Sequence, residues 1–203
     1  HFMYIHIHTY VNMYICKYMY KYIHTINTIQ MYRHDRLAHL ITLFQDTDYF
    51  LGFKLVRGAY LEKENLKAVK EGYRSPMQPT KTATDTDFDA ALALCIQHIE
   101  RVSICAGTHN AQSCLRLTEL MEANNIKVDD KRIWFAQLMG MSDNISFNLA
   151  SEGYNVAKYV PYGPIINVLP YLSRRAEENS SIAGQMGREL SLIQEELKRR
   201  KQA

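Results

Sequence analysis

This sequence of 203 residues has few cysteines, little net charge and no long apolar run. The cysteines include no Cys-x-x-Cys pair, which argues against a disulfide framework and a zinc site and fits a reducing compartment. Their positions are Cys16, Cys95, Cys105 and Cys114. Lys17 and Lys21 interrupt the most apolar stretch, so no segment reaches the length of a membrane-spanning helix.

The charge balance and the glycine pattern argue against two further classes. The formal net charge is only +3, and no basic stripe with interleaved aromatics is present, so we expect no nucleic-acid partner. No Gly-x-Gly-x-x-Gly occurs, which weakens the case for an open, doubly wound nucleotide-binding sheet. With 47% hydrophobic residues, a chain of this length buries a sizeable core and is most simply one domain.

Residues 1–34 differ in composition from the rest and are rich in Tyr, Ile, His, Met, Lys, Thr and Asn. They follow no helical or strand period and lack the Arg- and Ser-rich amphipathic pattern of a mitochondrial presequence. We therefore expect a low-complexity, non-native-looking or disordered segment, with the fold confined to residues 35–203. The pair His6-x-His8 has no carboxylate or cysteine nearby, so we expect no metal site there or elsewhere.

From Asp35 onward, apolar periodicity predicts alternating strands and helices. The expected strands are residues 53–56, 102–106, 133–136 and 156–160. The expected helices are residues 36–45, 85–100, a helix ending near 124–125, a short helix ending near 153, and a last helix after Pro164. A loop containing Pro76 and Pro79 is expected before residue 85. This order predicts an α/β fold with parallel strands.

Polar or glycine-bearing clusters follow each expected strand. In a (β/α)8 barrel, the carboxyl ends of the strands form the active-site face. Tyr60, His109, Gln137 and Tyr159 would then converge on that face. An open doubly wound sheet is the alternative fold.

The last expected helix contains the sequence Arg174-Arg175-x-x-Glu178. On a helix, Glu178 shares a face with both arginines. A guanidinium pair binds a carboxylate through paired hydrogen bonds, and the nearby acid can hold an amine. The cluster therefore suits a small zwitterion, whereas an exposed helix with internal ion pairs is the alternative.

Five motifs in this order resemble the signature of the proline dehydrogenase family, from about Asp35 to the C-terminus. They are residues 54–60, 108–110, 137–141, 158–164 and 171–179. The resemblance implies a flavoprotein that oxidises L-proline to 1-pyrroline-5-carboxylate and passes electrons to ubiquinone at the mitochondrial inner membrane. It also implies a partial barrel comprising strands five to eight, their helices and a C-terminal helix. Eight strands need about 250 residues, and only four are readable.

The resemblance assigns FAD contacts to residues at three strand ends. They are Lys54, Arg57, Gly58, Ala59, Thr108, His109, Asn110 and Gln137. Catalytic roles fall to Lys54, Tyr60 and Tyr159. The charge of Lys54 near a flavin would favour a reduced, anionic ring, whereas the alternative for this lysine is an ion pair with a carboxylate.

The resemblance also assigns the substrate contacts. Arg174 and Arg175 would bind the proline carboxylate, and Glu178 would lie near the amine. Leu138 would pack on the proline ring. Hydroxyproline dehydrogenase, the alternative enzyme, has a small residue at the position of Tyr159. Tyrosine there favours proline, and packing on the barrel rim is its alternative role. A different class remains open, namely a non-catalytic half-barrel, either a fragment or a pseudoenzyme.

Overall fold

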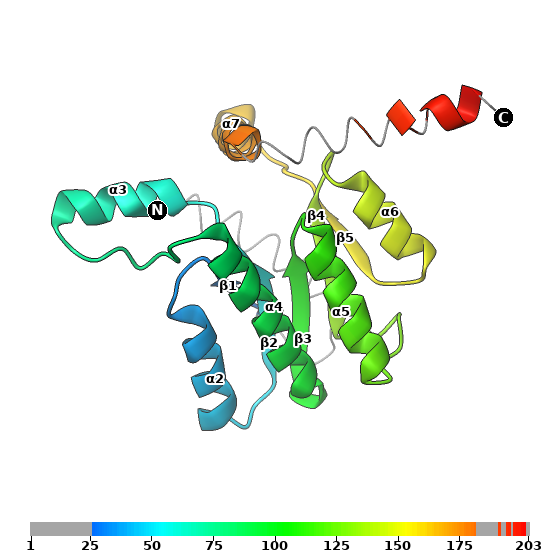
Figure 1. The fold of residues 1–203 in the computed structure, drawn as a ribbon, viewed down its shortest axis with the longest axis horizontal. Coiled ribbons are helices and arrows are strands. Elements are labelled where there is room, and N and C mark those ends of the chain that lie inside the picture. The colour runs from blue at the N-terminus through cyan, green and yellow to red at the C-terminus, as the bar shows by residue number, and fades with distance from the viewer. Residues whose placement is uncertain (1–25, 182–190, 192–193, 196, 202–203) are drawn as a thin grey trace. The chain divides into compact units, whose positions relative to one another are not determined.

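The computed structural model describes residues 26–181, 191, 194–195 and 197–201. The chain divides into two compact units, one ending at Tyr159 and one beginning at Val160. The strands are β1 (Asn27–Gln30), β2 (Leu51–Val56), β3 (Val102–Gly107), β4 (Ile133–Leu138) and β5 (Val156–Tyr159). The helices are α2 (Arg36–Asp46), α3 (Leu61–Glu71), α4 (Lys81–Gln97), α5 (Ala111–Ala123), α6 (Asp143–Ser151) and α7 (Ile165–Ser181), with a 3-10 turn at Ile99–Arg101 (Figure 1).

The five described strands form one parallel sheet in the order β1-β2-β3-β4-β5. Each strand pairs with its neighbours in sequence, as Lys54 does with Cys105 between β2 and β3. A doubly wound sheet reverses its strand order at a switch point, and no reversal occurs here. Consecutive parallel strands with helical crossovers are what a segment of a (β/α)8 barrel provides, so the expected α/β class is confirmed.

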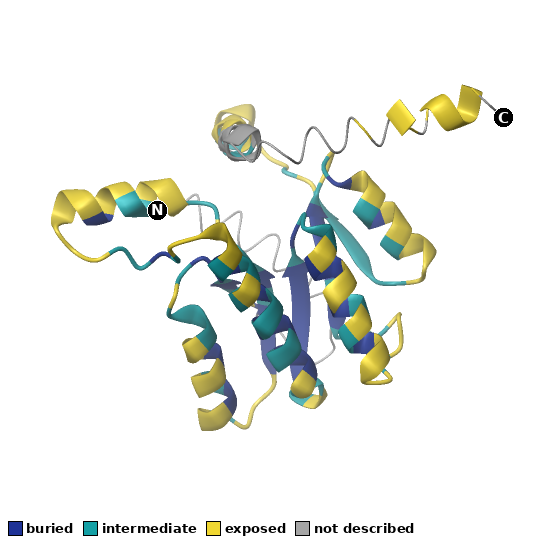
Figure 2. Ribbon diagram, in the orientation of Figure 1, coloured by how far each residue is buried: buried dark blue, intermediate teal, exposed yellow. Residues whose placement is uncertain are grey.

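One face of the sheet is buried against the helices. Figure 1 shows α4 and α5 crossing in front of it, and Figure 2 shows the strands behind them as the most buried part of the molecule. Side chains alternate between the two faces of a strand, so Phe53 and Leu55 of β2 point to this layer. The same core contains Phe88, Leu92, Ile104, Leu117, Ile133 and Phe135.

The other face of the sheet carries Lys54 and a smaller apolar cluster. Cys105 of β3 and Ala136 of β4 are buried there with Ile26. Trp134 and Ala157 pack against them. Polar side chains of the strand ends occur on both faces, since Lys54 lies on this one whereas Arg57 and Gln137 bond to residues of the helices.

The structure corrects the expected boundary of the fold. Residues 1–34 were expected to lie outside it, yet Asn27–Gln30 forms β1 and pairs with β2 along its whole length. Ile26, Ile29 and Tyr32 are buried. In the count that the family resemblance implies, β1 is the strand before strands five to eight. Residues 1–25, including the His6-x-His8 pair, lie outside the described residues.

Two helices also differ from expectation. A loop was expected from Tyr60 to residue 85, but α3 occupies Leu61–Glu71. Ala68 is its one buried residue, so α3 adds almost nothing to the core. Helix α4 begins at Lys81 rather than Asp85, because the Thr80 side chain accepts a hydrogen bond from the Ala83 N–H (3.1 Å) and caps the helix.

All four expected strands are present as β2 to β5, and their limits agree to within two residues. The interspersed charges of residues 188–201 predict a terminal helix, and the described residues among them (191, 194–195 and 197–201) are helical. No helix in the described part of the chain is long and apolar enough to cross a membrane.

Arg101 immediately precedes β3 and links the start of that strand to the end of α2. Its guanidinium donates to the carbonyl oxygens of Phe44 and Thr47 at the C-terminus of α2. The guanidinium carbon also lies 5.7 Å from the centroid of the Phe44 ring, which stacks on His98. A cation at this point satisfies carbonyls that α2 itself leaves without partners.

We expect Arg101→Met to lower the free energy of unfolding by about 2 kcal/mol, the size of hydrogen bonds from a charged donor. Urea denaturation followed by circular dichroism measures the loss. Arg116→Met is the matched control, because Arg116 makes only an exposed i,i+3 pair with Glu119 (3.5 Å) and should change stability by less than about 0.5 kcal/mol. Equal losses in the two variants would contradict the capping role of Arg101.

Candidate active site at the carboxyl ends of the strands

Lys54 and Tyr159 meet across the second face of the sheet. Lys54 Nζ lies 5.9 Å from the centroid of the Tyr159 ring, although β2 and β5 are separated by two strands. Three strand spacings span about 14 Å in a flat sheet, so the two long side chains must reach toward each other across β3 and β4. Within the described residues Lys54 makes no ion pair with a carboxylate; its contact is with the face of an aromatic ring.

Gly107 of β3 lies against Val56 and Lys54 of β2. A Cβ at Gly107 would lie 2.9 Å from Val56 Cγ1 and 3.5 Å from Lys54 Cε. The neighbours of Lys54 in register are Thr28 of β1 and Cys105 of β3. Burial raises the pKa of the Cys105 thiol to about 11, against an opposing effect of Lys54. The thiol therefore stays protonated at neutral pH, and Lys54 provides a positive charge on a mostly apolar face.

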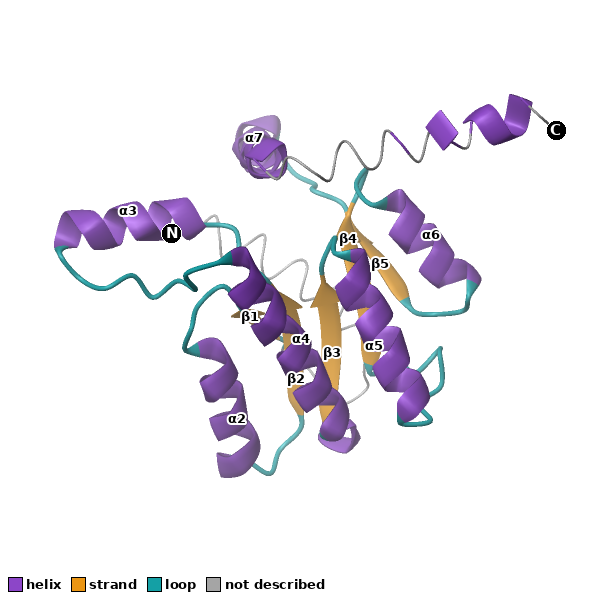
Figure 3. Cartoon of the chain, viewed as in Figure 1, coloured by secondary structure: helices purple, strands orange, loops and turns teal. Residues whose placement is uncertain are grey.

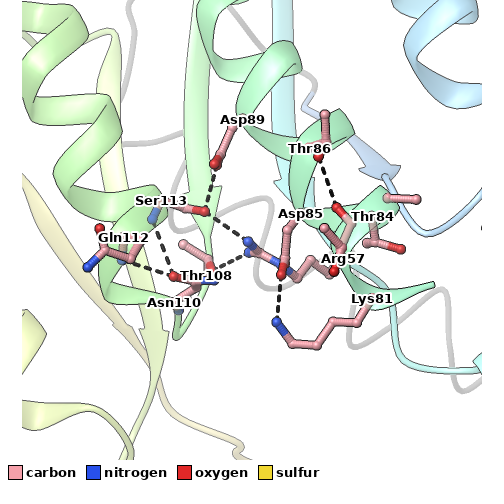
Figure 4. A network of polar contacts seen from close by, with 12 residues as sticks. Arg57, Lys81, Thr84, Asp85, Thr86, Asp89, Thr108, Asn110, Gln112 and Ser113 are labelled. Atoms are coloured by element: carbon pink, nitrogen blue, oxygen red, sulfur yellow. Dashed lines mark hydrogen bonds and ion pairs between the residues drawn. The ribbon is translucent and has the colours of Figure 1, made fainter.

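Arg57 is held by the helices at the carboxyl end of β2 (Figure 4). Its Nε donates to Asp85 Oδ1 (2.5 Å) and its two terminal nitrogens donate to Thr108 Oγ1 (2.7 Å) and Ser113 Oγ (2.8 Å). The guanidinium also lies 4.4 Å from the centroid of the Phe88 ring. Arg57 therefore joins β2 to α4, to the end of β3 and to α5. The guanidinium is therefore fully used by partners within the protein.

Acidic residues of α4 complete the Arg57 network. Asp85 also accepts from Lys81 Nζ (2.6 Å), and Asp89 Oδ1 accepts from the Ser113 hydroxyl (2.6 Å). Burial alone would raise the pKa of Asp85, but the hydrogen bonds from Lys81 and Arg57 outweigh it and hold that pKa below its usual value. The charge of Arg57 is thus compensated within the protein.

The turn after β2 depends on Gly58. Its φ is +123°, and a Cβ there would lie 1.8 Å from two carbons of the Tyr32 ring. Tyr32 follows β1, is buried, and its backbone N–H donates to the Arg57 carbonyl (2.7 Å). The ring of Tyr32 therefore packs directly on the turn, in a place that no side chain at residue 58 could share.

Thr108 and Gln137 are brought together between β3 and β4. Gln137 Nε2 donates to the Thr108 carbonyl (3.2 Å), and Gln137 Oε1 accepts from the Ser146 hydroxyl (3.0 Å). All three side chains are buried. Asn110 begins α5, and its Oδ1 accepts from the backbone N–H groups of Gln112 and Ser113 (2.9 and 3.3 Å).

His109 lies beside this pair, and its Nδ1 is 3.0 Å from Ser142 Oγ. Burial, helped by the positive charge of Lys158, lowers the pKa of His109 to about 4. The imidazole is therefore neutral at pH 7. Ser142 and Lys158 were not among the predicted site residues: Lys158 belongs to the motif at residues 158–164 but was given no role, and Ser142 lies one residue beyond the motif at residues 137–141.

The remaining predicted residues of the first unit lie at the same edge of the sheet. Leu138 and Tyr159 are neighbours in register on β4 and β5, and the Met139 N–H donates to the Tyr159 carbonyl (2.9 Å). Tyr60 precedes α3, and its carbonyl accepts from the Glu64 N–H (2.9 Å). Ala59 and Tyr60 are half-buried.

Arg174, Arg175 and Glu178 all belong to α7, in the second unit (Figure 3). The predicted cluster is thus helical. The Arg175 guanidinium lies 5.3 Å from the centroid of the Tyr171 ring, one turn earlier, so an aromatic side chain supports the arginine. The side chains of Arg174 and Glu178 lie outside the described ones.

Comparisons with known proteins point to one family. The family model described as proline dehydrogenase matches residues 3–188, which includes most of the segment expected to lie outside the fold. Proline dehydrogenase 1, mitochondrial, of Homo sapiens is 40% identical over 180 residues, covering 86% of this chain and 30% of that protein. Hydroxyproline dehydrogenase of Xenopus laevis is 38% identical over 182 residues, covering 86% of this chain and 39% of that protein.

Among solved structures, proline utilization A from Bdellovibrio bacteriovorus, inactivated by N-propargylglycine, superposes with a TM-score of 0.71 at 25% identity. The alignment covers 76% of this chain and 16% of that one. The chain therefore spans less than two fifths of the length of these relatives.

We expect Gly58→Ala to lower the free energy of unfolding by about 3 kcal/mol or more, because the new Cβ meets a buried ring and the backbone conformation is strained. Urea denaturation measures the loss. Gly72→Ala is the control, since Gly72 has φ +73° but open space around its missing Cβ and should cost only about 1 kcal/mol. Adding Tyr32→Ala to Gly58→Ala should recover part of the loss; additive losses would refute the packing of Tyr32 on the turn.

Proposed function

The chain belongs to the proline dehydrogenase family, and we propose that it serves in the FAD-dependent oxidation of L-proline to 1-pyrroline-5-carboxylate. The observation that carries the proposal is the arrangement of Lys54, His109, Gln137 and Tyr159, which come from four strand ends and lie at one edge of a sequentially ordered parallel sheet. Because the chain spans only part of its relatives, the activity is proposed for the protein to which this segment contributes.

The residues at this edge fit a flavin. Lys54 supplies a cation without a carboxylate partner among the described residues, and Gly58 has no side chain of its own beside the buried ring of Tyr32. The neutral imidazole of His109 can hydrogen-bond without adding charge. The residues that would hold the flavin are Lys54, Arg57, Gly58, Ala59, Thr108, His109, Asn110 and Gln137. When bound, the flavin would accept a hydride from C5 of proline.

The role of Lys54 follows from its surroundings. A fixed positive charge on a mostly apolar face stabilises negative charge that develops beside it. The Tyr159 ring beneath the ammonium group limits the positions that Lys54 can take. Tyr60, at the carboxyl end of β2, would border the same pocket.

Substrate recognition would fall to α7 and the ends of β4 and β5. Arg174 and Arg175 would bind the proline carboxylate, with Glu178 near the amine. Leu138 would contact the proline ring together with Tyr159. Tyr171 stacks on Arg175, which reduces the freedom that the guanidinium loses when it binds a carboxylate.

Tyr159 favours proline over hydroxyproline. Its ring already contacts Lys54, so the space for a ring hydroxyl that a small residue would leave is filled. Hydroxyproline dehydrogenase is nevertheless a relative at 38% identity, and it remains the second candidate. A mitochondrial location is part of the proposal and rests on relatives whose names include "mitochondrial". Ubiquinone as electron acceptor and attachment to the inner membrane are also part of it, and they rest on the family resemblance alone.

We expect the purified chain to show a visible flavin absorption band that L-proline bleaches and that trans-4-hydroxy-L-proline bleaches more slowly. Anaerobic absorption spectroscopy with each imino acid in turn is the measurement. A colourless protein that does not take up added FAD would support the fragment or pseudoenzyme alternative. Faster bleaching by hydroxyproline would instead support the second candidate.

We expect Arg175→Met to weaken proline binding at least ~30-fold, because truncating one partner of a desolvated, hydrogen-bonded charge pair costs about 2–5 kcal/mol. The flavin content should not change. Proline titration of the flavin spectrum, in the whole protein, gives both quantities. Arg116→Met serves as the control arginine, and an unchanged affinity for proline in Arg175→Met would contradict the carboxylate assignment.

A further inference from the structure

Ser142 has an unusual backbone and an unusual hydrogen bond. It precedes α6 with φ +50°, in the left-handed region that residues other than glycine seldom adopt, and it is only 3% exposed. A serine at a helix N-cap normally accepts a hydrogen bond from the first turn of its own helix. The Ser142 side chain makes no such cap; its hydroxyl lies 3.0 Å from Nδ1 of His109, in the loop between β3 and α5.

Lys158 of β5 binds the residues on both sides of this serine. Its Nζ donates to the Met141 carbonyl (2.7 Å) and to Asp143 Oδ1 (2.7 Å). A longer contact reaches the Leu138 carbonyl (3.4 Å). One half-buried ammonium group therefore fixes the loop between β4 and α6 immediately before and after Ser142.

A second set of hydrogen bonds connects the first turn of α6 to the loop after β3. The buried hydroxyl of Ser146 lies 3.2 Å from the Ser142 carbonyl and 3.0 Å from Gln137 Oε1. Gln137 Nε2 in turn donates to the carbonyl of Thr108, the residue before His109. The first turn of α6 thus reaches the backbone at residue 108 and the side chain at residue 109 by separate routes.

We propose that Ser142 and Lys158 are positioning residues, which fix the orientation of the His109 imidazole through the loop between β4 and α6. The inference rests on the proposed function, in which His109 contacts the flavin. Neither residue touches the flavin or the substrate in this proposal. Serine accepts the left-handed backbone because that conformation aims its hydroxyl at His109 rather than at its own helix.

The charges around His109 favour the neutral ring. Lys158, from β5, lowers the pKa of the imidazole in addition to the effect of burial. Asp143, from α6, is paired with Lys158 and more exposed, so it offsets that effect only in part. Removing Lys158 should therefore release the loop and also make His109 easier to protonate.

The first experiment follows His109 by nitrogen-15 NMR of the histidine rings, with His109→Gln identifying its signals. Ser142→Ala and Ser142→Gly both remove the hydroxyl, but glycine also suits the left-handed backbone. We expect the tautomer populations of His109 to change equally in both variants, while the melting temperature of Ser142→Gly stays above that of Ser142→Ala. Unchanged ring signals in both would overturn the role of Ser142.

The second experiment varies the lysine. In Lys158→Met we expect the pKa of His109 to rise by about one unit, and in Lys158→Arg to stay near its original value. Lys131→Met is the matched control, because Lys131 is an exposed lysine bonded to a side-chain amide (Lys131 Nζ to Asn155 Oδ1, 3.3 Å). A pKa of His109 that is the same in Lys158→Met and in the unmodified chain would overturn the role of Lys158.

A titration with FAD tests whether the orientation of His109 affects flavin binding. Ser142→Ala and Lys158→Met should each weaken FAD binding about five- to tenfold, the size of one hydrogen bond. Altered His109 signals with unchanged FAD affinity would overturn the positioning role at a flavin site. If the whole protein to which this segment contributes binds no FAD, the proposed function fails, whereas the NMR experiments still decide whether Ser142 and Lys158 orient His109.

Discussion

Sequential parallel pairing of β1 to β5 is the constraint on which the described structure depends. A parallel neighbour can be reached only by a long crossover, so helices fill one face of the sheet and every carboxyl end lies at the same edge. Lys54 and Tyr159 then meet on one face of the sheet although two strands lie between them. The hydrogen bonds of Arg57, Gln137 and Ser142 then join the loops and helices around these strand ends.

Basic residues near that edge fall into two kinds. Arg57 and Lys158 have their charges satisfied by Asp85 and Asp143, and each joins a strand to a loop or helix beside it. Lys54 instead rests against an aromatic ring on a mostly apolar face. The electrostatic character of the site therefore comes from one lysine, whereas the other two cations keep the surrounding loops in place.

The sequence predicted the elements that carry strong apolar runs. Strands β2, β3 and β4 each have buried residues in most positions, and they were found near their true limits. Strand β1 was missed because Ile29 is its one buried residue, so pairing with β2 rather than its own composition makes it a strand. Helix α3 was missed for the same reason, since it buries only Ala68.

By itself, the sequence determined the parallel α/β class, the ordered motifs at the strand ends and the helical Arg174-Arg175-x-x-Glu178 cluster, because these depend on local periodicity and spacing. Only the tertiary structure decided how the side chains are used. Arg57 turns to Asp85 of α4, and the Ser142 hydroxyl turns to His109. Such partners lie far apart in the chain and meet only when the strands pair, so no local pattern could reveal them.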